Sequence, residues 1–293
     1  MKPPPFRYHD PETVADVVGL LGRLDNAKLL AGGQSLMPML SMRYVLPDDV
    51  IDLNRVRGLA HLREAGGALE IGAMSRQRDI EFSGLVRTRC PLLHEAILQV
   101  GHRQTRNRGT LGGSLCQLDP AAELVAVAIA LDSTVSITGP KGDREIPFAE
   151  FPAGYMTPAL AADEMLTGAR FPLWKEGHGH AFVEYARRHG DFAVVSAAAL
   201  LEEDQSGRIT RASVTIGGTG PAPVRVRDAE RALVGNAASA RLFREACESC
   251  RKLDAMGDVH APAPYRKHLA AVLSSRALEK AHSRVSIAKS MSR

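Results

Sequence analysis

Apolar and polar positions along the first 57 residues follow two different periods. Residues 10–24, DPETVADVVGLLGRL, repeat apolar side chains at helical spacing, with Asp10 in the capping position and Pro11 in the first turn. The short apolar runs at 27–33 and 48–56 are typical of buried strands. One helix with two such strands predicts a small α/β lobe over residues 1–57.

Residues 58–173 mix the two periods. Residues 59–74 predict a hairpin that turns at Gly66 and Gly67, residues 133–151 predict a second hairpin, and 164–172 a further strand. Between them, 75–102 predict two helical pieces broken at Pro91. A helix follows over 121–131, which we expect Asp119 to cap with Pro120 at its first position. These elements predict an α+β lobe over 58–173.

The polar, glycine-containing stretch 173–178 predicts a domain boundary. Beyond it, residues 180–188, 192–204 and 209–221 have the pattern of three strands, and 226–235 and 239–253 that of helices. We therefore expect a small α+β domain over 178–280. The basic segment 281–293 has little apolar periodicity and is predicted to be a loose tail.

Composition and charge narrow the functional classes. A net charge of +4 is mild, and the most basic stretch, HRQTRNR at 102–108, has no aromatic residue, so we expect no nucleic-acid partner. That stretch is either a solvated turn or a loop facing an anion or a partner. No secretory signal pattern or bilayer-length apolar run is seen, which favours a cytoplasmic location with no integral membrane segment. Cys247 and Cys250 lack further ligands nearby, so we expect no metal site.

Two glycine segments carry the candidate chemistry. The first is AGGQSL at 31–36 and the second is TLGGS at 110–114, and both are bounded by apolar runs. Successive glycine N–H groups form a concave nest that binds phosphate oxygens, and nearby hydroxyl groups add donors. The simplest interpretation of one such pair is a tight turn. Two of them suit the two phosphates of a permanently bound dinucleotide, although the three-glycine fingerprint of dinucleotide-binding βαβ units is absent.

Glu123 lies early in the helix that follows the second segment. One interpretation is a first-turn carboxylate favoured by the helix dipole. The other is a carboxylate that accepts hydrogen bonds from a ligand ribose or base amine. The residues alone leave both open.

Three motifs in order resemble one family. AGGQSLMPML, RNRGTLGGSLCQLDPAAEL and YARRHGDFAVVSAAALL are together similar to the FAD-binding medium subunit of the molybdenum hydroxylases, in particular the carbon monoxide dehydrogenase type and, more distantly, the xanthine dehydrogenase type. The resemblance implies an α+β chain. Its first part would be a two-lobed FAD-binding domain of the p-cresol methylhydroxylase and vanillyl-alcohol oxidase type. Its C-terminal α+β domain would carry a three-stranded antiparallel sheet.

The resemblance also implies cofactor contacts from five regions. The first loop would contribute through its backbone, the second through its glycines and hydroxyl groups, and three later regions through four single residues. Val183 stands where xanthine dehydrogenase has a cofactor-contacting lysine, so NAD handling is not implied. The residues implied to contact FAD are Ala31, Gly32, Gly33, Gln34, Ser35, Leu36, Thr110, Leu111, Gly112, Gly113, Ser114, Glu123, Leu166, Asp191 and Phe192.

The implied role is electron transfer within a larger oxidoreductase. A molybdenum large subunit would hydroxylate the substrate, an iron–sulfur small subunit with two [2Fe–2S] clusters would pass electrons on, and FAD in this chain would deliver them to an external acceptor. A dimer of heterotrimers is implied. Two alternatives stay open: a self-contained flavin oxidoreductase that meets its substrate at FAD, and an assembly subunit with a vestigial site. No catalytic residue is expected in this chain.

Overall fold

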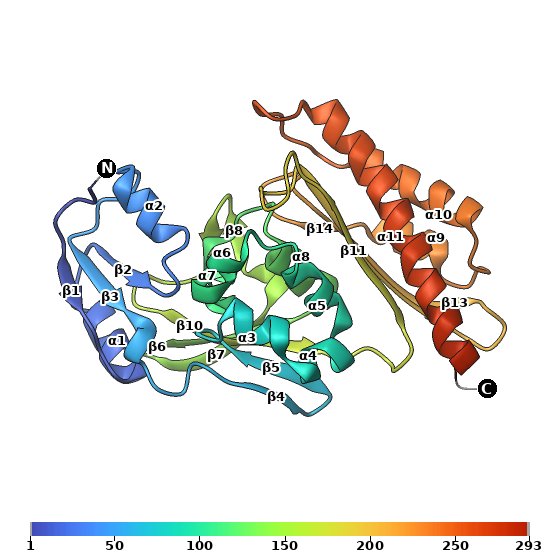
Figure 1. Ribbon diagram of the computed structural model, residues 1–293. Helices are drawn as coiled ribbons and strands as arrows, with labels where there is room; N and C mark the ends of the chain where they lie inside the picture. Colours follow the sequence, from blue (N-terminus) through green and yellow to red (C-terminus); the bar gives the residue numbers. More distant parts are fainter. Residues whose placement is uncertain (1, 292–293) are drawn as a thin grey trace.

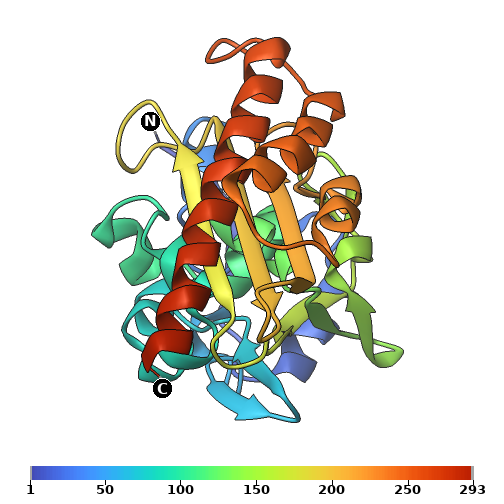
Figure 2. The same ribbon diagram turned by 90° about the vertical axis from the view of Figure 1, so that its right-hand side faces the viewer.

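The computed structural model describes residues 2–291 and arranges them around three main sheets (Figure 1). A small N-terminal lobe lies on one side, a central lobe in the middle, and a C-terminal domain on the other side. Figure 2 shows the C-terminal sheet from the front, with the last helix crossing it.

The N-terminal lobe is a parallel sheet with strand order β1-β3-β2. Its α1 helix packs Val17 and Leu21 against Ile51 of β3. The helix begins later than the sequence predicted: Thr13, not Asp10, is the N-cap, because its hydroxyl accepts from the Asp16 N–H. The elements are β1 (Arg7–His9), α1 (Val14–Leu21), β2 (Ala27–Leu30), α2 (Leu36–Ser41), β3 (Asp49–Asp52) and η1 (Leu53–Arg55).

The central lobe holds a five-stranded antiparallel sheet with order β4-β5-β10-β6-β7. Helices cover one of its faces (Figure 1). The predicted hairpins and last strand are confirmed. The strands are β4 (Leu62–Ala65), β5 (Ala68–Gly72), β6 (Thr134–Gly139), β7 (Gly142–Pro147), β8 (Pro152–Gly154), β9 (Thr157–Pro158) and β10 (Met165–Pro172), with η2 at Phe148–Glu150.

The helices of this lobe correct three predictions. The segment 75–102 forms three helices, since Ser83 ends the first and caps the second through the Val86 N–H. The basic stretch at 102–108 is a helix instead of a turn. Asp119 does not cap the following helix, because its carboxylate is bonded to the Ala121 N–H in a preceding turn. The helices are α3 (Gln77–Phe82), α4 (Gly84–Arg89), α5 (Pro91–Ile97), α6 (Arg103–Arg108), α7 (Leu111–Gln117) and α8 (Glu123–Ala130).

The C-terminal domain is an antiparallel sheet with helices on its outer face (Figures 1 and 2). The sheet has four strands instead of the expected three, because the short β14 joins β13. The predicted loose tail is also wrong for 281–291, where one helix continues and buries Ala281 and Val285. The elements are β11 (Gly179–Tyr185), β12 (Val195–Glu203), β13 (Ile209–Gly217), β14 (Val224–Arg225), α9 (Arg227–Leu233), α10 (Ala240–Cys247), η3 (Glu248–Lys252) and α11 (Ala263–Met291).

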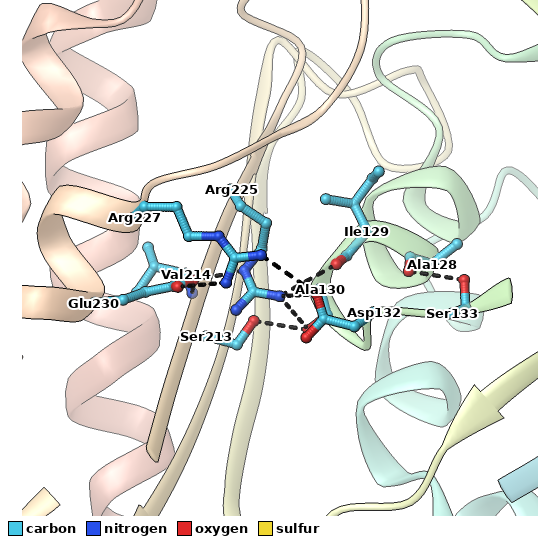
Figure 3. A network of polar contacts seen from close by, with 10 residues as sticks. All are labelled: Ala128, Ile129, Ala130, Asp132, Ser133, Ser213, Val214, Arg225, Arg227 and Glu230. Atoms are coloured by element: carbon cyan, nitrogen blue, oxygen red, sulfur yellow. Dashed lines mark hydrogen bonds and ion pairs between the residues drawn. The ribbon is translucent and has the colours of Figure 1, made fainter. Parts of the chain in front are cut away.

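Helix α8 joins the central lobe to the C-terminal domain. All eight of its residues are buried, and the core of the central lobe continues into Phe182, Ala198 and Leu200 of the C-terminal sheet. At the end of α8, the Arg225 guanidinium donates to the Ile129 and Ala130 carbonyls and pairs with Asp132 and Glu230 (Figure 3). A cation at a helix C-terminus satisfies free carbonyls and opposes the helix dipole. The domain is therefore fixed to α8 by packing and by charge.

Candidate functional site

The two glycine segments, nearly eighty residues apart in sequence, meet in the structure. A Cβ atom added to Gly32 would lie 2.3 Å from the Arg108 carbonyl oxygen and 2.8 Å from the Gly109 Cα. A Cβ atom added to Gly113 would lie 3.6 Å from that of Ala31. Only a residue without a side chain allows such an approach of two backbones. The segments thus form one structural unit at the junction of the two N-terminal lobes.

The first segment leaves backbone donors open. It follows β2, and Gly33 adopts a φ of +74°, which turns the chain sharply before α2. Within residues 2–291, the N–H groups of Gly33, Gln34, Ser35 and Leu36 have no protein acceptor. Gln34 donates its side-chain amide to the Gly32 carbonyl at 3.3 Å and is itself exposed. This loop therefore matches the predicted anion nest.

The second glycine segment does not form the predicted anion nest. Residues 111–117 form α7, capped by the Thr110 hydroxyl, which accepts from the Gly113 N–H at 3.0 Å. The Leu111 and Gly112 N–H groups donate to the Ser75 and Ala73 carbonyls. These amides are already used inside the protein, so the predicted second nest is wrong. The glycines serve instead to bring α7 against Ala73 and the first loop.

A hollow of about 340 Å³ opens beside the first segment. Arg108, at the end of α6, is the one cationic residue among those that line it. Of the two meanings left open for the basic stretch, an anion-facing position is the one that this geometry favours. The hollow is lined by Leu30, Gly32, Gly33, Gln34, Met37, Pro38 and Arg108.

Two residues that the sequence did not single out hold the segments together. Asn54 donates its side-chain amide to the Ala31 carbonyl at 3.2 Å. Arg76 donates to the Asn54 side-chain oxygen and to the Arg108 carbonyl. Burial and the nearby Arg108 guanidinium lower the pKa of Arg76. Neither residue lies in a glycine motif, so only the fold reveals this bridge.

Glu123 lies at the other end of the site, where α8 meets the C-terminal sheet. Its side chain is 5% exposed, and burial raises its pKa to about 8 with the help of Glu184 and Asp119. A first-turn carboxylate that served only the helix dipole would be favoured in its charged form. A hydrogen bond from the Glu123 backbone N–H acts in the opposite direction to burial, as expected of a first-turn carboxylate, so the contact of Glu123 with a ligand stays a prediction.

The three remaining predicted contacts are dispersed. Asp191 and Phe192 lie in the exposed loop between β11 and β12, and the Phe192 side chain is 65% exposed. This loop approaches α6, because a Cβ on Gly190 would lie 2.4 Å from the His102 ring. Leu166 is buried in the core of the central lobe, at an irregularity in β10. The structure thus brings the loop that carries Phe192 near the start of α6 and leaves Leu166 in the core.

Comparison with known proteins defines the class. A model described as the FAD binding domain in molybdopterin dehydrogenase matches residues 4–174, and one for the CO dehydrogenase flavoprotein C-terminal domain matches 180–281. The chain therefore belongs to the family of FAD-binding subunits of molybdopterin dehydrogenases. It is an oxidoreductase component whose cofactor is FAD, as the three sequence motifs predicted.

Relatives cover nearly the whole chain. Subunit alpha of the 6-hydroxypseudooxynicotine dehydrogenase complex of Paenarthrobacter nicotinovorans is 37% identical over 96% of both chains. The carbon monoxide dehydrogenase medium chain of Hydrogenophaga pseudoflava is 32% identical over 97% of this chain and 99% of its own. A solved carbon monoxide dehydrogenase structure from that organism superposes with a TM-score of 0.94 at 34% identity, over 97% of this chain and 99% of its counterpart.

Two negative findings apply to the part of the chain that the structure describes. It contains no group of three or more His, Cys, Asp or Glu side chains that could hold a metal ion. None of its helices combines the length and apolar character needed to cross a bilayer. Cys247 and Cys250 are buried in the C-terminal core, where Cys250 donates to the Ser274 hydroxyl at 3.6 Å.

Proposed function

We propose that the meeting point of the two glycine segments holds the diphosphate bridge of FAD. The fit rests on the open N–H groups of residues 33–36, on Arg108 in the lining of the hollow beside them, and on a close backbone approach that a Cβ atom on Gly32 would block. The hydroxyl groups of Ser35, Thr110 and Ser114 stand along the same junction. Backbone N–H groups and a guanidinium are the donors that phosphate oxygens prefer.

In this proposal the chain is the subunit of a molybdenum hydroxylase that passes electrons to an external acceptor. Bound FAD supplies the chemistry of accepting electrons from [2Fe–2S] clusters of a small subunit and releasing them to an external acceptor. The residues of this chain bind and orient the cofactor: the first loop and Arg108 at the diphosphate, Glu123 at the C-terminal junction, and Leu166, Asp191 and Phe192 toward the flavin. The names of the relatives, which are medium chains and complex subunits, support this role.

Three finer features complete the proposal. The parallel N-terminal sheet set against the antiparallel central sheet supports an arrangement of the p-cresol methylhydroxylase and vanillyl-alcohol oxidase type, with units at 1–57, 58–173 and 178–280. The chain would assemble with a molybdenum large subunit and an iron–sulfur small subunit as a dimer of heterotrimers. This assembly would work in the cytoplasm.

Flavin content tests the proposal directly. The purified chain is expected to show flavin absorbance that acid releases, since no covalent link is proposed. Adding FAD at a hundred times its dissociation constant should stabilise the fold by about 2.7 kcal/mol. A colourless chain whose unfolding midpoint does not change when FAD is added contradicts the proposal. An isolated chain that oxidises a small substrate by itself supports the self-contained oxidoreductase instead.

A further inference from the structure

One face of the C-terminal sheet turns toward α8 and is lined by polar side chains. A Cβ on Gly217 of β13 would lie 2.6 Å from the Ser196 hydroxyl, 3.3 Å from the Pro120 carbonyl oxygen and 3.6 Å from the Ala126 Cβ. Ser196 therefore points at the start of α8. Glu184 pairs with Ser196 across β11 and β12, so its side chain lies on the same face.

Polar atoms on this face lack partners within the protein. Within residues 2–291, the Glu184 Oε2 atom and the Ser196 hydroxyl are buried and bonded to no protein group. Ser196 is fully buried. Leaving buried polar atoms unpaired costs about 1–3 kcal/mol each, so such a group in a native structure usually meets a ligand or water. Glu123 faces the same junction from α8 and is an electrostatic neighbour of Glu184.

Resting on the proposed function, we propose that Glu184 is a cofactor-positioning residue contributed by the C-terminal domain. Glu123 and Glu184 together hydrogen-bond a hydroxyl group on one of the sugar chains of FAD. A hydroxyl both donates and accepts, and a protonated carboxyl offers an acceptor and a donor in return. The sugar chains are the parts of FAD next to the diphosphate. The first glycine loop and α8, which carries Glu123, both contact α7, which fits this order.

The charged groups around the pair favour the protonated carboxyls. Arg106 of α6 is a cation that acts on Glu123, but it already donates to Glu81 and to the Val100 and Gly101 carbonyls. Asp119, in the turn before α8, adds negative charge. On α5, His94 is the other titratable group, and Glu95 pairs with Lys280 and Arg284 at the far end of β11. Two ionised carboxylates at this junction would therefore repel each other.

The sign of the pH effect follows from these surroundings. Burial raises the pKa of Glu184 to about 7 and that of Glu123 to about 8, so both carboxyls are protonated at pH 6 and both are ionised at pH 9. FAD affinity should accordingly be full at low pH and fall as the pH rises through 7–8. A glutamine at either position imitates the protonated carboxyl and cannot ionise.

The test is a titration of FAD into the flavin-depleted full chain between pH 6 and pH 9. We expect the dissociation constant of the wild type to rise about tenfold, which corresponds to one pKa unit. In Glu184→Gln it should change less than about threefold over the same range, and Glu123→Gln should flatten the profile in the same way. Glu176→Gln, an exposed position just before β11, is the matched control and should follow the wild type.

The outcomes separate this inference from the proposed function. If the wild type binds FAD and Glu184→Gln keeps the wild-type pH profile, the role of Glu184 is wrong and the flavin site stands. If the wild type binds no FAD at any pH, both fall. Unfolding midpoints of the flavin-free variants are measured in parallel. A Glu184→Gln effect confined to those midpoints makes the residue a structural acid and overturns the inference. Should that variant fail to fold, the Glu123→Gln profile decides.

Discussion

At the scale of single residues, Gly32 allows the backbones of the two glycine segments to lie close together. Replacing it with valine puts a Cβ atom only 2.3 Å from the Arg108 carbonyl oxygen, so the first loop and α6 must separate. We expect Gly32→Val to lose bound FAD and to destabilise the fold by about 1–3 kcal/mol, the usual range for overpacking. Flavin absorbance per chain and the urea midpoint measure the two effects.

The control for this change is another glycine. Gly19 lies in α1 with nothing within 4 Å of an added Cβ. Gly19→Ala should keep its flavin and gain about 0.5–1 kcal/mol from helix propensity. Full flavin occupancy in Gly32→Val would show that the two segments need not touch for FAD to bind.

The same scale shows what the sequence could predict of the site. Two glycine pairs with neighbouring hydroxyls correctly indicated converging backbones. The glycine pattern could not predict which N–H groups lack a protein acceptor. That depends on the Ser75 and Ala73 carbonyls, which accept from the Leu111 and Gly112 N–H groups. Thr110 three residues before Gly113 is an N-cap signal that predicts a helix there. That local signal was available, and the interpretation of the segment as a loop missed it.

At the scale of elements, the bridge through Asn54 and Arg76 joins η1 to the end of α6. Asn54→Ala frees the Ala31 carbonyl and one donor of Arg76. We expect a loss of about 1–2 kcal/mol in FAD affinity, roughly a tenfold rise in the dissociation constant. Asn107→Ala, an exposed asparagine in α6, is the matched control and should leave FAD affinity unchanged. Equal affinities for both variants would remove the bridge from the binding site.

Element boundaries were the least predictable part of the fold. The strands and hairpins followed from apolar alternation, but four helix starts and ends did not, because they depend on which polar side chain finds a backbone partner. Thr13, not Asp10, caps α1, because its hydroxyl accepts from the Asp16 N–H. Ser83 divides a helical segment expected to be continuous, because its hydroxyl accepts from the Val86 N–H. Helix α11 extends through 281–291 because Ala281 and Val285 pack against the C-terminal sheet. The sparse apolar pattern of this segment does not predict that packing.

At the scale of the whole molecule, the C-terminal domain must stay fixed to α8 for a site that spans both. The Arg225 guanidinium supplies that fixation, since it and Glu230 are both 9% exposed and Arg225 also reaches Asp132 of the central lobe (Figure 3). Arg225→Met keeps the apolar stem and removes the charge. Glu230 would stay buried with only the Val214 N–H and the half-exposed Arg227 as donors.

Breaking a buried pair on one side leaves an uncompensated charge, so Arg225→Met should cost roughly 2–3 kcal/mol. Each kcal/mol lowers the unfolding midpoint of a chain of this size by about 2–4 °C. The matched control is Arg231→Met, whose partner Asp228 is exposed, and it should cost less than about 1 kcal/mol. Because bound FAD would contact both sides of the α8 junction, a loosened junction should weaken FAD binding, and added FAD should raise the midpoint of Arg225→Met less than that of the control. If the two variants unfold at the same temperature, the domains are held by apolar packing alone, and the coupling between their junction and the cofactor must be sought in Phe182, Ala198 and Leu200.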